Sequence, residues 1–488
     1  MKILEDLVGS LDILSLEGNP DVVVEGICSD SREAAPGRLF VALRGTQTDG
    51  HRFIPQAVAQ GACAVVAEQF PEGLPKTACL VKVPDAHIAL ARLAAAFYDN
   101  PSQQLKLVGI TGTNGKTTTV TLLYRLFMAM GCKSGLVSTV ENRIGDEVLP
   151  ATHTTPDPLE LQALLRRMAD AGCTHCFMEV SSHAIVQHRV AALNFAGGIF
   201  SNISRDHLDY HKTFSAYIAA KKAFFDSLPS TAFALSNSDD PHGRVMLQNT
   251  AAHTFLYGLK SGNADFRARV VEYGMEGMHL ELDGHELWCR LTGEFNAYNL
   301  LAVYASACLL GADREQVLPL LSALEPAEGR FHCIGGDRQV TAIVDYAHTP
   351  DALENVLQAI RKMRRPGQRI LTVVGCGGNR DKGKRPQMAR IAFRDSDLLI
   401  LTSDNPRFED PSAILDDMCR GLEGVDPSAY RVEADRREAI RLAVREAGTG
   451  DIILVAGKGH EKYQESNGVR RHFDDVEVVS EYLCSSKQ

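Results

Sequence analysis

The segment Gly109-Ile110-Thr111-Gly112-Thr113-Asn114-Gly115-Lys116-Thr117-Thr118 follows an apolar run and precedes the helical pattern TVTLLYRLFMAM. At such a junction, glycines let backbone N–H groups close around phosphate oxygens, and the helix N-terminus adds partial positive charge. Lys116 is expected to reach the β- and γ-phosphates of a nucleotide, and Thr117 to offer its hydroxyl to Mg²⁺. The usual pattern has glycine where this chain has Ile110. Glycine-rich turns alone are common, but Gly-Lys-Thr-Thr at a helix start favours nucleotide binding.

Short apolar runs alternate with longer amphipathic segments from residue 105 onward. Many runs end in Gly, Ser, Asn or Asp, which is typical of stacked strand-and-helix units. Their hydrophobicity is continuous rather than alternating, as in parallel strands that are buried on both faces. The runs are KLVGITG, KSGLVST, HCFMEVSS, GGIFSNIS and AFALSNSDD, and then TAIVDYAHT, RILTVVGCGG, DLLILTSDNPR and DIILVAGKGHE.

A different pattern separates the two sets of runs. Residues 266–291 alternate polar and apolar side chains around Asp283-Gly284, which predicts an antiparallel hairpin. A helix is expected over residues 299–310, ending at Gly311.

Two groups of turn residues indicate domain boundaries. They are Asp99-Asn100-Pro101 and Glu325-Pro326, where the strand and helix patterns stop. A chain of 488 residues suggests about three domains at roughly 150 residues each. The predicted domains are residues 1–98, 99–326 and 327–488.

Composition and charge exclude several classes of protein. Hydrophobic residues make up 45% and charged residues 23%, as in ordinary globular proteins. The net charge is −10, whereas proteins that bind nucleic acid by neutralising its phosphates usually have a basic excess, which leaves only a local basic patch as an alternative. Acids interrupt the apolar residues of the first segment from Glu5 onward, unlike a signal peptide. The longest uncharged apolar stretch, residues 300–312, falls short of the ~20 residues of a membrane helix. We therefore expect a cytoplasmic protein that neither binds nucleic acid nor inserts into membranes.

Acidic and imidazole side chains follow two of the predicted strands. Glu179 ends the run HCFMEV, at the strand end where such sheets bind ligands, and its carboxylate suits Mg²⁺. Residues 202–211 contain two histidines and two aspartates. A single histidine there would be an ordinary polar residue, but four such groups in one loop favour a site.

Further motifs follow the phosphate loop in a fixed order. They are Glu179-Val180-Ser181-Ser182-His183, Asn202-Ile203-x-x-Asp206-His207-Leu208-Asp209, Tyr217-x-x-Ala220-Lys221, Gly293-Glu294-Phe295-Asn296-x-x-Asn299, Gly329-Arg330-Phe331, Asp345-Tyr346-Ala347-His348-Thr349-Pro350 and Gly457-Lys458-Gly459-His460-Glu461. This ordered set resembles that of the Mur ligases, ATP-dependent amide-bond synthetases of peptidoglycan precursor assembly, and extends over essentially the whole chain.

The resemblance implies an α/β fold with three domains and a monomeric enzyme. A small N-terminal α/β domain would bind the uridine nucleotide, a central phosphate-loop ATPase domain would contain a parallel sheet, and a C-terminal Rossmann-like domain would bind the amino acid. It also implies a role in cell-wall biogenesis, and so in cell shape and division.

Two segments narrow the expected activity. The segment from Asp30-Ser31-Arg32 to Leu43 is similar to the uridine-nucleotide domain of the members that add the third peptide residue. Asp404-Asn405-Pro406-Arg407 resembles the signature of the members that add meso-2,6-diaminopimelate to the D-glutamate side chain of UDP-N-acetylmuramoyl-L-alanyl-D-glutamate. Diaminopimelate has one more carboxylate than lysine, and the Arg407 guanidinium can bind a carboxylate bidentately. Without the rest of the resemblance, this segment would be only a turn after a strand, because Asn-Pro favours turns.

In this family the γ-phosphoryl group of ATP activates the D-glutamate carboxylate, and the resulting acyl phosphate is attacked by the amine of diaminopimelate. The site residues follow from the matching motifs. The ATP ligands would be Gly112, Thr113, Asn114, Gly115, Lys116, Thr117, Thr118, Asn299, Arg330, Asp345 and His348. The UDP-substrate ligands would be Ser31, Thr154, Thr155, Ser181, Gln187 and Arg189. The diaminopimelate ligands would be Arg380, Asp404, Asn405, Arg407, Gly457 and Glu461.

The resemblance also implies two Mg²⁺ ions. Thr117 and Glu179 would hold the first, and His207 with Lys221 the second, provided that CO₂ carbamoylates Lys221. Lys116, Lys221 and His207 would then be the catalytic residues. From the residues alone, Lys221 and Lys222 would be solvated charges on a helix.

Three alternatives stay open. They are a sibling ligase that adds L-lysine, a folylpolyglutamate synthetase, and a protein that uses ATP as a switch without ligase activity. The first would have no use for Arg407, and the second would lack the Asp-Ser-Arg domain.

Overall fold

The apolar runs of the central domain form the parallel core of an eleven-stranded sheet in the computed structural model, which describes residues 1–45, 48–336 and 339–484. In sheet order the strands are β11 (Glu147–Pro150), β10 (Glu141–Ile144), β9 (Ser134–Val137), β12 (His175–Glu179), β8 (Lys106–Thr111), β13 (Phe195–Phe200), β14 (Phe233–Asn237), β15 (His253–Gly258), β16 (Phe266–Gly274), β17 (Gly277–Leu282) and β18 (His285–Cys289). Neighbours from β9 to β16 are parallel, and the strands at both edges are antiparallel.

Helices cover this sheet. They are α4 (Lys116–Ala129), α5 (Pro158–Asp170), α6 (Ser182–Val186), α7 (Leu208–His211), α8 (Phe214–Asp226), α9 (Gly243–Met246), α10 (Glu294–Leu309) and α11 (Arg314–Ala323). The apolar face of α4 packs on β12, where the rings of Phe127 and Phe177 lie 5.0 Å apart. This packing fixes the phosphate loop, which lies between β8 and α4.

The region between the two sets of runs departs from the prediction in two details. Residues 266–291 are antiparallel as expected, but they form three strands, because a second turn separates β16 from β17. The predicted helix at 299–310 begins earlier, at Glu294, so the predicted start was wrong. Gly293 precedes it with φ +89° and makes no side-chain cap, so no capping residue marks the start in the sequence.

The third domain is a six-stranded Rossmann-like sheet. Its order is β19 (His332–Gly335), β20 (Thr341–Asp345), β24 (Ile452–Ala456), β21 (Ile370–Cys376), β22 (Leu398–Ser403) and β23 (Tyr430–Val432). All neighbours except β19 and β20 are parallel. Its helices are α12 (Pro350–Met363), α13 (Lys384–Asp395), α14 (Pro411–Cys419), α15 (Arg436–Glu446) and α16 (Asp475–Cys484), and a hairpin of β25 (Tyr463–Ser466) and β26 (Val469–His472) follows β24.

The N-terminal domain has a five-stranded sheet. Its order is β2 (Ser15–Glu17), β7 (Cys79–Lys82), β6 (Ala64–Ala67), β5 (Arg38–Val41) and β4 (Gly26–Cys28), with the short pair β1 (Lys2–Ile3) and β3 (Val23–Val24) beside it. Helices α1 (Leu4–Val8), α2 (Ile54–Ala59) and α3 (Ala86–Phe97) cover this sheet. The expected three-domain α/β fold is thus confirmed.

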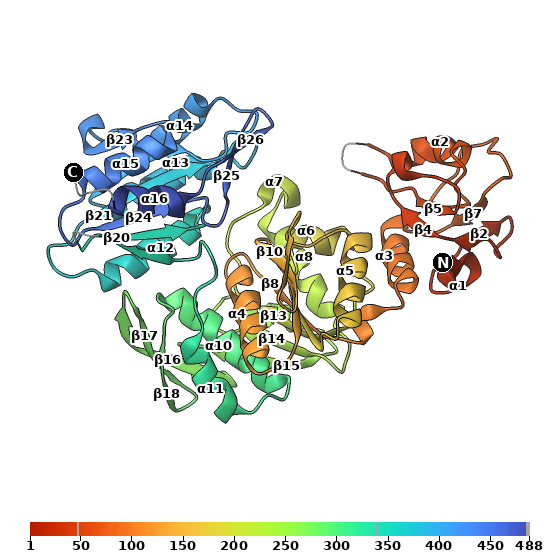
Figure 1. Ribbon diagram of the computed structural model, residues 1–488, viewed down its shortest axis with the longest axis horizontal. Helices are drawn as coiled ribbons and strands as arrows, with labels where there is room; N and C mark the ends of the chain where they lie inside the picture. Colours follow the sequence, from red (N-terminus) through yellow and green to blue (C-terminus); the bar gives the residue numbers. More distant parts are fainter. Residues whose placement is uncertain (46–47, 337–338, 485–488) are drawn as a thin grey trace.

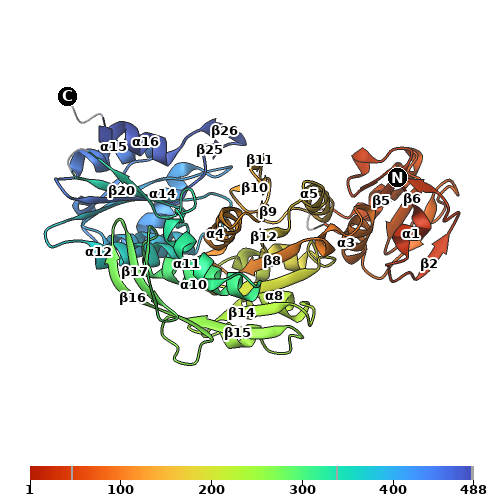
Figure 2. The same ribbon diagram turned by 60° about the horizontal axis from the view of Figure 1, so that its bottom comes forward.

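The N-terminal domain lies apart from the third domain, at the other end of the central domain (Figures 1 and 2). It contacts the central domain through α3, which packs against α5. The third domain lies against the central one (Figure 1), and residues at the carboxyl ends of β8, β12, β13, β14 and β20 line a common cavity. Within the part of the chain that the structure describes, no helix is both long and apolar enough to span a bilayer.

Candidate active site

A cavity of about 840 Å³ lies between the central and third domains. Its central wall contains the phosphate loop, Glu179, His207, Lys221 and Asn299. Its other wall contains the segment 345–348 and one face of α12. The cavity thus brings together predicted site residues from segments that are far apart in the chain.

The phosphate loop adopts a backbone conformation that requires glycine. Gly115 has φ +89°, and a Cβ added there would lie 2.5 Å from Asn299 Oδ1. Helix α4 begins at Lys116, whose Nζ donates to the carbonyls of Gly112 and Thr113, each at 2.9 Å. Burial lowers the pKa of Lys116, whereas Glu179 and Asp206 oppose that shift. The lysine is therefore folded over an anion-binding turn at a helix N-terminus.

Thr117 and Glu179 are in direct contact. The Thr117 hydroxyl donates to Glu179 Oε1 at 2.9 Å, and the backbone N–H of Thr139 donates to the same oxygen at 2.8 Å. Arg330, from the other side of the cavity, donates from Nη2 to Thr117 Oγ1 at 3.0 Å. A hydroxyl and a carboxylate are hard oxygen ligands, so this pair fits Mg²⁺.

His207 and Lys221 lie on the same side of the loop. Lys221 is buried, and its Nζ donates to the Gly112 carbonyl at 2.8 Å and lies 4.6 Å from the centre of the Tyr217 ring. Burial, and then the neighbouring Lys116, hold the pKa of Lys221 well below its ordinary value. Burial also lowers the pKa of His207 to about 4. The interpretation of Lys221 as a solvated charge is therefore wrong.

The remaining predicted ATP ligands come from α10 and the third domain. Asn299 accepts from the Thr119 hydroxyl at 3.4 Å. The Arg330 guanidinium lies 4.5 Å from the Tyr346 ring centre. Burial lowers the pKa of His348 to about 4 and raises that of Asp345, whose carboxylate accepts from the backbone of Phe331 and Ala347, each at 2.7 Å. Asp345 thus shapes the loop that contains Arg330.

Four of the six predicted UDP-substrate ligands form one network. Thr155 Oγ1 donates to the Glu179 carbonyl at 2.8 Å and accepts from the Ser181 N–H at 3.1 Å. Arg189 donates to the Thr155 carbonyl at 2.7 Å and to Gln187 Oε1 at 3.0 Å. Thr154 lines the cavity and accepts from Thr139. Ser31 is buried in the N-terminal domain and does not line the cavity.

The predicted diaminopimelate ligands gather at the carboxyl ends of β21, β22 and β24, outside the lining of the large cavity. Asn405 Nδ2 donates to Glu461 Oε2 at 2.7 Å, and Asn405 N–H donates to Asp404 Oδ1 at 2.6 Å. A Cβ on Gly457 would lie 2.7 Å from Asp404 Oδ2. Burial and Asp404 raise the pKa of Glu461, against the effect of Lys458 and Asn405.

The two arginines of this group meet at the loop after β21, which contains Arg380 and is contacted by Arg407. Arg407 Nη1 donates to the Gly378 carbonyl at 2.9 Å, and Arg380 is exposed nearby. A Cβ on Gly377 would lie 2.8 Å from Arg407 Nη1 and 3.9 Å from Arg380 Cγ. The same loop faces α6 of the central domain, which contains His183. Burial is the main cause of the lowered pKa of His183, and the positive charge of Arg380 has a smaller effect in the same direction.

Asp351 is among the cavity residues that the sequence did not indicate. Asp351 accepts from Asn114 Nδ2 at 2.8 Å and from the Ser204 hydroxyl at 3.1 Å, so it connects the third domain to the phosphate loop. Burial raises its pKa. An acid in the first turn of a helix is so common that it carries no functional signal in a sequence.

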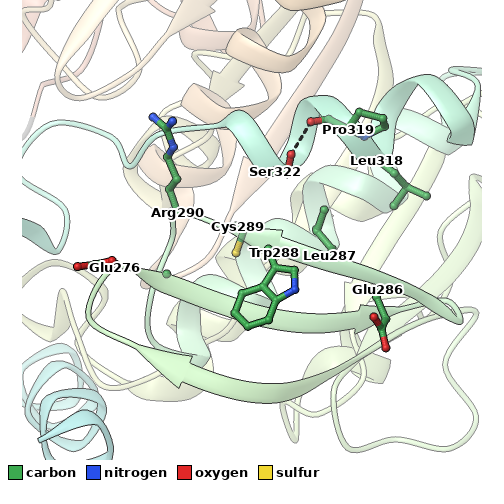
Figure 3. A pocket seen from close by; sticks show the side chains of 10 residues that line it. Glu276, Glu286, Leu287, Trp288, Cys289, Arg290, Leu318, Pro319 and Ser322 are labelled. Carbon is green, nitrogen blue, oxygen red and sulfur yellow. Dashed lines mark hydrogen bonds between the residues drawn. The ribbon is translucent and has the colours of Figure 1, made fainter.

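A second, shallower hollow lies between β18 and α11 (Figure 3). Its lining includes Trp288, which is 61% exposed and whose ring stacks on that of His279 with 4.4 Å between the ring centres. The hollow shares no lining residue with the large cavity. Among the described residues, no group of three or more His, Cys, Asp and Glu side chains is arranged to hold a metal ion.

Comparison with known proteins identifies the family. The Mur ligase middle domain matches residues 110–307, the glutamate ligase domain of Mur ligases matches 329–459, and the catalytic domain of the Mur ligase family matches 23–98. The UDP-N-acetylmuramoyl-L-alanyl-D-glutamate–2,6-diaminopimelate ligase of Cytophaga hutchinsonii is 56% identical over 98% of this chain and 99% of its own. That of Bacteroides fragilis is 53% identical over 98% of both chains.

A solved structure of a ligase with the same name agrees with these matches. It is 34% identical, superposes with a TM-score of 0.71, and covers 99% of both chains. Since identity at this level extends over all three domains, the chain belongs to the Mur ligase family of ATP-dependent amide-bond ligases.

Proposed function

We propose that this protein joins meso-2,6-diaminopimelate to the D-glutamate side chain of UDP-N-acetylmuramoyl-L-alanyl-D-glutamate, forming ADP and phosphate, in peptidoglycan precursor synthesis. The observation that carries the proposal is the group of charges at the strand ends of the third sheet. Arg380 lies in the loop after β21, Arg407 contacts the same loop, and the carboxylate of Glu461 lies beside Asn405. The distal end of diaminopimelate has one carboxylate and one amine, which these charges complement. Lysine has no distal carboxylate for the arginines.

The reaction needs two steps, because a carboxylate at neutral pH does not acylate an amine. The γ-phosphoryl group of ATP passes to the D-glutamate carboxylate, which gives ADP and an acyl phosphate. The amine of diaminopimelate then attacks the acyl carbon, and the tetrahedral intermediate expels phosphate. Both steps concentrate negative charge, which Lys116 and the backbone N–H groups of the phosphate loop would stabilise.

The nucleotide would lie along the phosphate loop, with Asn299 on the central side and Arg330, Asp345 and His348 on the other. Arg330 already reaches Thr117 across the cavity. Closure of the third domain over ATP would exclude water from the acyl phosphate. The UDP-dipeptide would extend from the network around Thr155 and Arg189 toward Ser31 in the N-terminal domain. This division of ligands supports domain boundaries near residues 98 and 326.

Two Mg²⁺ ions fit the proposal. Thr117 and Glu179 would hold one and His207 and Lys221 the other, and bound Mg²⁺ would neutralise charge on the transferring phosphoryl group. A lysine amine is a poor ligand for Mg²⁺, so the second site requires Lys221 to be carbamoylated. Its buried position beside the Gly112 carbonyl supports this assignment.

The carbamate can be tested by replacement. Lys221→Ala should lose most activity, and short-chain carboxylic acids should restore part of it by supplying the missing carboxylate. Full activity of the untreated variant would remove Lys221 from the metal site. Lys222→Ala, one position along α8, is the matched control and should retain activity.

The function itself is tested by ADP release in the presence of the UDP-dipeptide while diaminopimelate, lysine and ornithine are offered in turn. We expect release with diaminopimelate and little with the other two. Preference for lysine would indicate the sibling ligase. Release that needs no amino acid would indicate an ATP switch.

A further inference from the structure

Lys458 is a fully buried lysine beside the proposed amino-acid site, and none of the site assignments above includes it. It lies in the loop that follows β24, between Gly457 and Gly459, which both have positive φ values of +118° and +53°. Burial of a lysine is unfavourable unless its ammonium is fully bonded. A buried lysine in this place therefore calls for an explanation.

The three N–H donors of the ammonium meet three acceptors from three different segments. Lys458 Nζ donates to the Tyr463 carbonyl, to Asn405 Oδ1 at 3.4 Å and to Glu461 Oε2 at 3.4 Å. A lysine ammonium has three donors, so each of them has a partner. The side chain thus ties the start of β25 to the loop after β22 and to its own loop.

These contacts set the orientation of the Asn405 amide. Asn405 Oδ1 accepts from Lys458 and from the Glu465 N–H at 2.9 Å, so Nδ2 is directed to Glu461 Oε2 at 2.7 Å. If the amide were reversed, the Nδ2 donor would face two other donors, the Lys458 ammonium and the Glu465 N–H. Lys458 thereby helps to hold the Glu461 carboxylate in place through Asn405 as well as directly.

The same contacts reach Arg407 through the backbone of β25. Lys458 binds the carbonyl of Tyr463, the first residue of β25, and two residues later the Glu465 carbonyl accepts from the Arg407 N–H at 3.0 Å. Gln464 Nε2 also donates to the Asp404 carbonyl at 2.8 Å. The hairpin β25–β26 is thus the support of the loop that contains Arg407, and Lys458 anchors its first residue.

We propose that Lys458 is a positioning residue for the amino acid: without touching the substrate, it holds Asn405, Glu461 and the start of β25 in the arrangement that receives the distal end of diaminopimelate. This inference rests on the proposed function. The other explanation is that Lys458 only stabilises the domain, as the buried Arg436–Asp475 pair does.

The charge of Lys458 also bears on Glu461. Burial and Asp404 raise the pKa of Glu461, and Lys458 and Asn405 lower it, so loss of the ammonium would raise it further. The titratable and charged groups facing Glu461 are Asp404, Lys458, Tyr463, Tyr346 and Arg436. Protonated Glu461 cannot attract an ammonium group of the substrate, so binding would weaken as the pH falls.

Steady-state kinetics of the full-length Lys458→Met variant test the proposal. The KM for diaminopimelate should rise at least tenfold and that for ATP less than twofold, and the low-pH rise in the KM for diaminopimelate should move to higher pH. With 2-aminopimelate, which lacks the distal amino group but keeps the distal carboxylate, the variant should raise the KM by a smaller factor than with diaminopimelate. If Lys458→Met does not fold, Lys458→Gln, which removes the charge and keeps a donor, is measured instead.

Asp451→Asn is the matched control. Asp451 is buried at the opposite end of β24, where it binds Arg369, so its loss should lower the Tm without changing the KM for diaminopimelate. A Lys458 variant that behaves like this control, or that raises both KM values equally, would overturn the proposal. Failure of the wild type to ligate diaminopimelate would instead refute the proposed function.

Discussion

Arg407 combines an unusual backbone conformation with a specific side-chain position. Its φ is +55°, in the left-handed region that a non-glycine residue rarely adopts. The Glu465 carbonyl and the Asn467 N–H hold its backbone on both sides, and its Nη1 donates to Gly378. A strained residue that its neighbours hold in place is characteristic of functional sites.

Arg407→Lys should raise the KM for diaminopimelate at least tenfold, or about 1.4 kcal/mol. The reason is that a point charge replaces a planar group able to bind a carboxylate with two hydrogen bonds. The KM for ATP should change less than twofold. Arg437→Lys, on the surface of the same domain, is the control and should alter neither value. Equal changes in both KM values for Arg407→Lys would contradict its assignment.

The ends of α4 contain two glycines in similar conformations but different surroundings. Gly115 has φ +89° and precedes the helix, and Gly131 has φ +81° and follows it. A Cβ would meet Asn299 at the first position and no atom within 4 Å at the second. Both alanine variants should therefore lose about 1–2 kcal/mol of stability from backbone strain.

Only Gly115→Ala should affect nucleotide binding, because its methyl group would displace Asn299 or the phosphate loop. We expect at least a tenfold rise in the KM for ATP for Gly115→Ala and less than a twofold change for Gly131→Ala. Calorimetric titration with ADP provides an independent measurement. Equal effects in both variants would mean that the crowding at Asn299 is unimportant.

Glu409 connects the segment before α14 to α13. Its carboxylate accepts from the buried Arg385 at 2.9 and 3.0 Å, and also pairs with Lys382. The Arg385 hydrogen bonds are the main cause of the lowered pKa of Glu409, from 4.5 to about 2. Because the pKa of Glu409 is lower in the folded state than in the unfolded state, its ionised carboxylate stabilises the fold. This stability is fully present above the unfolded pKa of about 4.5 and is lost as the pH falls to the folded pKa of about 2.

At 1.36 kcal/mol per pKa unit, this contribution is at most about 3 kcal/mol. The difference in unfolding free energy between the wild type and Glu409→Gln should therefore shrink as the pH falls from 6 to about 3. Urea unfolding at several pH values measures it. Glu423→Gln, at an exposed position of the same domain, should show no such trend. A constant difference at all pH values would disprove the ion-pair explanation.

Among the described residues, three polar links between cavity-lining side chains connect the central and third domains. Asp351 binds Asn114 and Ser204, Arg330 binds Thr117 at 3.0 Å, and Lys362 pairs with Glu294 at 2.6 Å. Asp351 and Lys362 lie at opposite ends of α12, so this helix both lines the cavity and connects the two domains. Relative movement of the two domains would change all three links.

Asp351→Ala should raise the KM for ATP about fivefold, because two partly buried hydrogen bonds at roughly 1 kcal/mol or less each are lost and the phosphate loop loses a contact. The radius of gyration from small-angle scattering should increase. Lys362→Ala removes a more exposed pair and should change the KM for ATP less than twofold. No change in either measurement for Asp351→Ala would show that the link does not hold the domains together.

Much of this structure could be read from local patterns. The nine apolar runs form strands, and α4 begins at Lys116, directly after the phosphate loop. Both features were predictable because hydrophobic periodicity and glycine conformation depend on residues that are close in the sequence. The start of α10 was predicted too late and β17 was not separated from β16, because those features have weak local signals. Glu179 was expected at a strand end, and β12 ends at that residue.

Only the tertiary structure decided which of these side chains meet. Thr117 and Glu179 are 62 residues apart, Asn405 and Glu461 are 56 apart, and Asn114 and Asp351 are 237 apart. Such contacts depend on the order of strands in each sheet and on how the domains pack, which local periodicity does not encode. For this reason the sequence pointed to the reaction through its motifs, whereas the contacts of Asp351 and Lys458 became visible only in three dimensions.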